Sequence, residues 1–203
     1  MAFPLLHLLV ADAYAKSRPA LARDGAYYLG AIAPDAIHMR PGITKEVHKV
    51  RTHLFAKGPD GLPEVMAYWY EVGRTPFDIG YGVHVITDRL WVGYYRQAFS
   101  GLIGANGQTL AEIYQPDAAW IDRALYAGGA KARAFWPLLQ SAPAPDAYPL
   151  LSGEEIDGWR RQVLALFDAV RELPRGDPMV MTLSGVQAFI PGALARLEVL
   201  IPD

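Results

Sequence analysis

The chain has 203 residues, 52% of them hydrophobic, which is enough to bury a substantial core within one domain. Its formal net charge is −2, and the basic residues form no patch along the sequence, so the composition gives no support for nucleic-acid binding. The chain contains no cysteine, which excludes disulfides and thiolate metal sites and leaves His, Asp and Glu as possible metal ligands.

The N-terminal stretch MAFPLLHLLVADAYA is apolar, and its Ala-Tyr-Ala end is similar to a signal-peptide cleavage site. It lacks a positively charged start, however, and His7 interrupts the apolar run. We therefore expect a cytoplasmic protein, with secretion as the alternative. No apolar run reaches the roughly 18 to 20 residues of a membrane-spanning helix, so we expect no transmembrane segment.

Apolar residues recur at spacings of three and four through most of the chain, as is typical of helices. The predicted helices cover residues 5–16, 23–32, 44–57, 62–72, 78–99, 108–114, 116–126, 130–139, 152–170 and 179–201. Pro191 should kink or split the last of them, and Ser152 with Glu155 forms a capping box at the start of the one before. No strand-like alternation or internal repeat is present. The prediction is an all-α, multi-helix bundle that forms a single domain over residues 1–203.

The predicted helix over residues 78–99 is apolar nearly all round, as expected of a helix enclosed by others. It nevertheless contains His84 and Asp88, which are four residues apart and therefore lie on one face of the helix. Burying an imidazole and a carboxylate costs several kcal/mol unless they are paired, hydrogen-bonded or bound to a cation. Taken alone, the two residues fit a buried hydrogen-bonded pair as well as a metal site.

Further ligand-type residues lie in the same half of the chain. All five histidines fall within the first 84 residues: His7, His38, His48, His53 and His84. Asp35 lies in the nearly uncharged stretch GAIAPDAIH, which we expect to be a loop, and carboxylates are rarely buried without a partner. Residues 4–95 therefore hold the candidate site, and the helical part after them has no assigned role.

The order of these elements resembles a known family. An N-terminal histidine is followed by GAIAPD, then by THLF, and then by GYGVHVITDRLW. This order is similar to that of the zinc-dependent phospholipase C family, whose all-helical fold also includes fungal single-strand nucleases. The resemblance covers roughly residues 4–95, and nothing matches beyond Tyr95.

The resemblance implies that Asp35, His53, His84 and Asp88 together hold one metal ion. It also implies that His7 helps to hold a second ion, with Asp88 shared between the two. Asp35 would in addition be catalytic, because it would orient or deprotonate the attacking water.

This sequence departs from the family pattern in two ways. The secreted phospholipases use the free amino end of the mature chain as a ligand, whereas six residues precede His7 here. They also have a further His and a His-x-x-x-Glu pair downstream, and this chain has no histidine after residue 84. A three-metal cluster is therefore excluded, and one or two ions remain.

Two imidazoles and two carboxylates suit zinc, which the resemblance implies, and also manganese, iron or magnesium. Such ions activate water and polarise phosphoryl oxygens, so we expect hydrolysis of a small-molecule or lipid phosphoester. Lys49, Arg51 and Arg89 are candidates to neutralise the phosphate, and His38 is either a hydrogen-bond donor to Asp35 or an ordinary loop histidine.

Two other functions are alternatives. One is a catalytically inactive helical protein with a binding or structural role that retains a metal site. The other is the helical HD-type phosphohydrolase, whose signature is an adjacent His-Asp dipeptide. This chain contains no such dipeptide, which argues against that family.

Overall fold

The computed structural model describes residues 3–43, 48–54, 74–99, 109–129, 133–147, 149–170, 172 and 176–201. Within these ranges the chain is helical, and its one β feature is an isolated bridge between Ala147 and Leu151. The all-α class is thus confirmed. The helices are α1 (Pro4–Ala15), α2 (Pro19–Ala22), α3 (Gly25–Gly30), the 3-10 helix η1 (Ala33–Met39), α4 (Val50–Thr52), α6 (Pro76–Phe99), α7 (Leu110–Ala127), α8 (Phe135–Ser141), α9 (Gly153–Asp168) and α10 (Leu183–Leu200).

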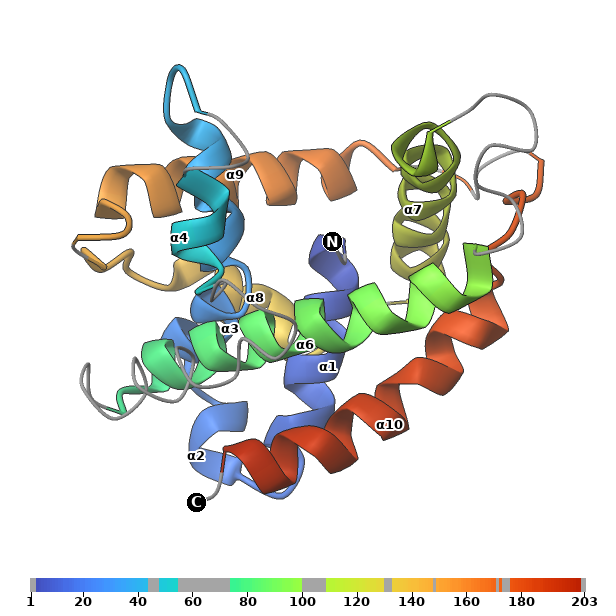
Figure 1. The fold of residues 1–203 in the computed structure, drawn as a ribbon. Helices are drawn as coiled ribbons and strands as arrows, with labels where there is room; N and C mark the ends of the chain where they lie inside the picture. The colour runs from blue at the N-terminus through green and yellow to red at the C-terminus, as the bar shows by residue number, and fades with distance from the viewer. Residues whose placement is uncertain are drawn as a thin grey trace.

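Helix α6 runs through the middle of this arrangement, with α1 and α3 behind it and α10 along its lower side in Figure 1. It begins at Pro76, two residues before the predicted start, because Thr75 accepts a hydrogen bond from the Asp78 backbone and the Asp78 side chain accepts one from Thr75. Residues 80–88 are all buried. The predicted central buried helix is therefore confirmed over the part that carries His84 and Asp88.

One predicted helix break is wrong. Residues 108–114 and 116–126 were expected to form separate helices, but α7 runs from Leu110 to Ala127 with Pro116 inside it. Residues on both sides of this proline, such as Ile113 and Ala118, are buried in the core, and their packing outweighs the backbone hydrogen bond that proline removes. At Pro191, where a kink or a split was predicted, α10 is a single helix and is not split, and Pro191 is exposed.

The segment around Asp35 also differs from its prediction. It was expected to be a loop, whereas η1 winds residues 33–39 into a 3-10 helix with Asp35 in its first turn. Helix α9 covers η1, and Arg40 just after η1 donates to both carboxylate oxygens of Glu155 at 2.6 and 2.9 Å. Glu155 is also part of the predicted capping box with Ser152, which is confirmed. Asp35 is therefore placed by a short helix that is held against α9.

Part of the prediction lies outside the described residues. This applies to the whole helix predicted over 62–72 and to most of the one predicted over 44–57. Of the latter, residues 48–54 are described and include the short helix α4.

Among the described helices, α10 has the length and mean hydropathy, 1.2, of a possible membrane span. These are properties of its length and composition alone, and core helices share them. Four of its apolar residues face the core: Val186, Phe189, Ala193 and Leu197. The finding is thus compatible with the expected absence of a transmembrane segment.

Candidate metal centre

Four separate segments bring the predicted ligands together. Helix α1 carries His7 and η1 carries Asp35, while His53 follows the last turn of α4. His84 and Asp88 lie on the buried part of α6. All five residues are at most 5% exposed, so the cluster lies in the interior of the molecule.

The backbone fixes the orientation of two of the imidazole rings. His84 Nδ1 lies 2.8 Å from the carbonyl oxygen of Ala31, and His53 Nδ1 lies 3.1 Å from that of Lys49. Because a carbonyl oxygen only accepts, these contacts are hydrogen bonds in the tautomer that carries the proton on Nδ1, and in a neutral ring of that tautomer Nε2 is a bare lone pair. The two Nε2 atoms face each other at 3.4 Å. Histidines that bind metal ions are oriented in this way.

The distances around His53 fit a metal ion. Its Nε2 lies 3.3 Å from Asp35 Oδ1, 3.5 Å from Asp88 Oδ2 and 3.4 Å from His84 Nε2. Two ligands of a tetrahedral zinc ion, each about 2.0 to 2.1 Å from the metal, are about 3.3 to 3.4 Å apart. The separation of 3.9 Å between His84 Nε2 and Asp35 Oδ2 is somewhat longer. These side chains therefore have close to the mutual spacing of the ligands of such an ion.

His7 contributes a further unsatisfied imidazole. Its ring stacks on that of His84, with the ring centroids 3.6 Å apart and the planes at 10°. Its Nε2 lies 3.4 Å from Asp88 Oδ1, yet neither ring nitrogen has a hydrogen-bond partner. A buried imidazole without a partner is costly, and a cation near Asp88 would satisfy it. Two overlapping groups, His7–Asp35–His84 and His53–His84–Asp88, each have the spacing to hold a metal ion.

The protonation states favour a cation as well. Burial acts to raise the pKa of both carboxyls, but it is outweighed by Lys49, His53 and His84 together at Asp35 and by the three histidines His7, His53 and His84 together at Asp88. Each pKa therefore lies well below its usual value. Burial, followed by the neighbouring His7, holds the pKa of His84 well below its usual value. The centre therefore combines two carboxylate anions with a neutral imidazole at His84.

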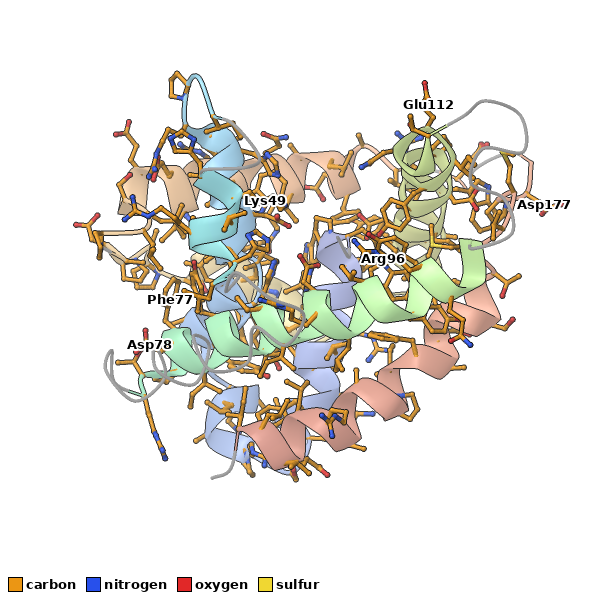
Figure 2. The ribbon with its side chains drawn as sticks, viewed as in Figure 1. Lys49, Phe77, Asp78, Arg96, Glu112 and Asp177 are labelled. Atoms are coloured by element: carbon orange, nitrogen blue, oxygen red, sulfur yellow. The ribbon has the colours of Figure 1, made fainter. Side chains whose placement is uncertain are left out.

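Sequence reasoning missed how Lys49 takes part. Its ammonium is buried and lies 2.7 Å from Asp35 Oδ1 and 3.4 Å from His38 Nε2 (Figure 2 labels Lys49 beside α4). The sequence spacing could have indicated this role, since Lys49 comes four residues before His53 and residues at this spacing lie on the same face of a helix. The other phosphate candidates point elsewhere: Arg51 is exposed and Arg89 donates to the Leu54 carbonyl.

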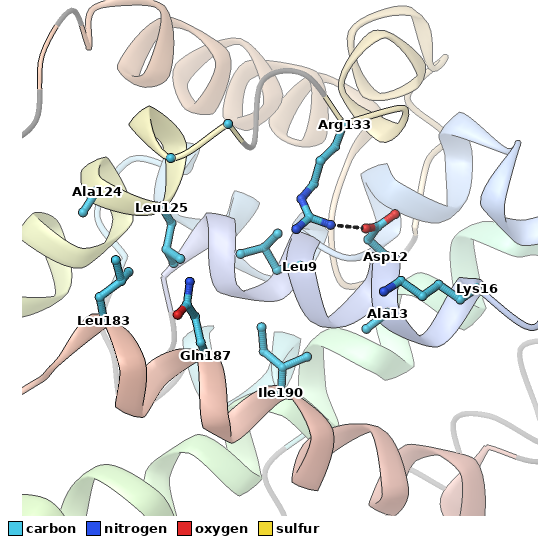
Figure 3. Close-up of a pocket in the computed structure, with 12 residues that line it drawn as sticks. Leu9, Asp12, Ala13, Lys16, Ala124, Leu125, Arg133, Leu183, Gln187 and Ile190 are labelled. Carbon is cyan, nitrogen blue, oxygen red and sulfur yellow. Dashed lines mark hydrogen bonds and ion pairs between the residues drawn. The ribbon is translucent and has the colours of Figure 1, made fainter.

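A separate cavity of about 230 Å³ lies between α1, α7 and α10, and none of the five predicted ligands lines it (Figure 3). Leu9, Leu125 and Ile190 give it an apolar floor, and Arg133 at its edge is ion-paired with Asp12 at 2.7 Å. The cavity thus lies apart from the histidine and aspartate cluster.

No protein-family model, curated protein or solved structure matches this chain. The likeness to the phospholipase C family consequently rests on the residue pattern alone. The structure shows a helical protein with a buried histidine and aspartate cluster that could hold a metal ion.

Proposed function

We propose that the cluster binds a divalent metal ion, with zinc as the first candidate, and that the protein hydrolyses a phosphoester. Asp35, His53, His84 and Asp88 would ligate one ion, and His7 with Asp88 would help to hold a second. One observation carries the proposal: two imidazole Nε2 atoms lie 3.4 Å apart in a buried site that also contains two carboxylates. With Nδ1 of each ring protonated, both Nε2 atoms would be available as ligands of a cation.

The chemistry follows from the residues around the ion. A bound divalent ion lowers the pKa of a water molecule toward neutrality and polarises a phosphoryl oxygen. Asp35 presents a carboxylate to the same space and orients the attacking water by accepting its hydrogen bond. Because its pKa is held below the usual range, orientation is a better role for Asp35 than proton uptake. Burial of the ligands keeps bulk water away from the reacting groups.

Metal analysis tests this proposal directly. Purified protein reconstituted with zinc should hold one or two equivalents and hydrolyse bis(p-nitrophenyl) phosphate. His84→Ala and the isosteric Asp88→Asn should lose both properties, whereas His48→Ala, which removes an imidazole outside the cluster, should keep them. Less than about a tenth of an equivalent in the reconstituted wild-type protein would contradict the proposal.

One observation favours a second candidate, an inactive helical protein with a binding or structural role that retains a metal site. The ammonium of Lys49 is already paired with Asp35, so this carboxylate has a stabilising partner even in a protein that catalyses no reaction. This candidate predicts bound metal without hydrolysis of nitrophenyl phosphates, phosphocholine-type diesters or single-stranded DNA. Activity that survives His84→Ala would belong to a contaminant rather than to this protein.

A further inference from the structure

Lys49 is a buried cation with unused hydrogen-bonding capacity. Its side chain is 5% exposed, and a buried ammonium is costly unless it is paired. Asp35 takes one of its three N–H donors at 2.7 Å, and His38 lies within 3.4 Å of the same nitrogen. In the described part of the chain these two contacts use at most two donors. One donor therefore remains for a ligand.

Exposure decreases from His38 toward the interior of the cluster. The side chain of His38 is 37% exposed, whereas Asp35 and Lys49 beneath it are nearly buried. His53 and His84, still deeper, are fully buried. The solvent side of the cluster is thus the side of His38 and Lys49, and a ligand that approaches from there meets the ammonium on its way to the metal ligands.

The charges make Lys49 the partner for an anion. With the single ion at Asp35, His53, His84 and Asp88 bound, the two carboxylates cancel its charge and leave no net positive charge for a phosphoester. No histidine follows residue 84, so the second half of the chain supplies no imidazole ligand for a further ion. Since Arg51 is exposed and Arg89 reaches the Leu54 carbonyl, Lys49 is the candidate cation that contacts the cluster itself.

We propose that Lys49 binds a non-bridging phosphoryl oxygen of the substrate, an inference that rests on the proposed phosphoester hydrolysis. Its ammonium and His53 Nε2 both contact Asp35 Oδ1, at 2.7 and 3.3 Å. An oxygen bound at Lys49 is therefore next to two of the proposed metal ligands. Lys49 in this role is a fixed charge that contacts the substrate. Its hydrogen bond to the phosphoryl oxygen would be charge-assisted, and such hydrogen bonds are among the stronger ones.

The test measures phosphate binding on zinc-loaded protein. Isothermal titration with inorganic phosphate is compared for the wild type, Lys49→Met and Lys49→Arg. Arg51→Met, two residues away on α4, is the control for loss of one positive charge. Zinc content is measured for every variant. We expect Lys49→Met to keep its zinc and to bind phosphate roughly tenfold more weakly or worse. Lys49→Arg should recover part of this affinity, and Arg51→Met should match the wild type.

Several outcomes would overturn the inference. Phosphate affinity in Lys49→Met within about twofold of the wild type, with zinc retained, removes it and leaves the proposed function intact. Loss of zinc from Lys49→Met also overturns it, because Lys49 would then be a positioning residue for Asp35 and His53. A wild-type protein that takes up no zinc overturns the proposed function itself.

A measurement on the unaltered chain covers the case in which Lys49→Met does not fold. Crystals of the zinc-loaded wild-type protein are soaked with inorganic phosphate. A phosphate oxygen about 3 Å from Lys49 Nζ supports the inference, and phosphate bound elsewhere, or not at all, overturns it.

Discussion

Asp122 on α7 is a buried carboxyl that supports the first turn of α1. Helix α1 starts after Phe3, which offers no side-chain cap, and the Leu5 backbone N–H donates to Asp122 Oδ1 at 3.0 Å instead. Burial raises the pKa of Asp122 to about 8, against the opposing effects of the Leu5 hydrogen bond and the Arg123 charge. In the folded protein at neutral pH this carboxyl therefore holds its proton. It caps α1 at Leu5, two residues before His7.

This raised pKa predicts a pH-dependent stability. Between the ordinary pKa of 3.8 and about 8, the folded chain keeps a proton at Asp122 that the unfolded chain releases. The contribution of Asp122 is thus fully present below pH 3.8 and is lost as pH rises toward 8, by at most about 1.4 kcal/mol per pH unit. Asp122→Asn keeps a side-chain oxygen that can accept the hydrogen bond from Leu5. Because the amide does not ionise, the loss of stability with rising pH should disappear. Urea unfolding at pH 5, 6.5 and 8 should show the variant gaining stability over the wild type with rising pH; parallel pH profiles would contradict the pKa.

At the scale of elements, the crossing of α3 and α6 sets the position of His84. A Cβ on Gly80 would overlap the Tyr27 carbonyl oxygen, and one on Gly30 would overlap the Phe77 carbonyl oxygen. Glycine at both positions lets the two backbones touch. His84 is one turn after Gly80, and its Nδ1 donates to Ala31, the residue after Gly30. The close approach of the two helices therefore also orients the imidazole.

We expect Gly80→Ala to disturb both the fold and the site. Overpacking typically costs about 1 to 3 kcal/mol, and the shift of α6 should lower zinc affinity by moving His84. Gly93→Ala on the same helix is the matched control. No atom lies within 4 Å of the added methyl group there, so it should stabilise α6 by about 0.5 to 1 kcal/mol. Urea unfolding and zinc titration of both variants measure these effects, and equal behaviour of the two would show that the crossing is not tightly packed.

Helices with clear local signals were predictable from sequence, and those shaped by packing were not. The capping box of Ser152 and Glu155 and the apolar run of α6 are encoded within a few residues, so both helices were found. Pro116 and Pro191 carry a local signal to break a helix, which contacts elsewhere in the fold override. The 3-10 turn at Asp35 is too short to produce a periodic pattern.

For the whole molecule, the predicted ligand set depended on a resemblance because long-range proximity leaves no local mark. The spacing of His84 and Asp88 alone placed them on one face of α6. Asp35 and His53 were added only through the order of motifs, and the structure brings their side chains within 3.3 Å of each other. The ion pair of Lys49 escaped prediction, since a lysine in a charged stretch normally lies at the surface.

The cluster joins α1, η1, the end of α4 and α6, so a bound ion should stabilise the whole fold. Zinc at about 100 times its dissociation constant adds roughly 2.7 kcal/mol, or roughly 5 to 10 °C in melting temperature for a chain of this size. Calorimetry with zinc and then with excess EDTA should show this increase and its reversal.

The same measurement separates ligation from general charge effects. Asp88→Asn should abolish the increase, because its buried carboxylate lies between His7 and His53. Asp12→Asn is the control, because it also removes one carboxylate charge, from the half-buried ion pair between Asp12 on α1 and Arg133. It should leave the zinc-induced increase in melting temperature unchanged. If zinc raised the melting temperature of both variants equally, it would be binding somewhere other than among the four joined segments, and the proposed centre would have to be abandoned.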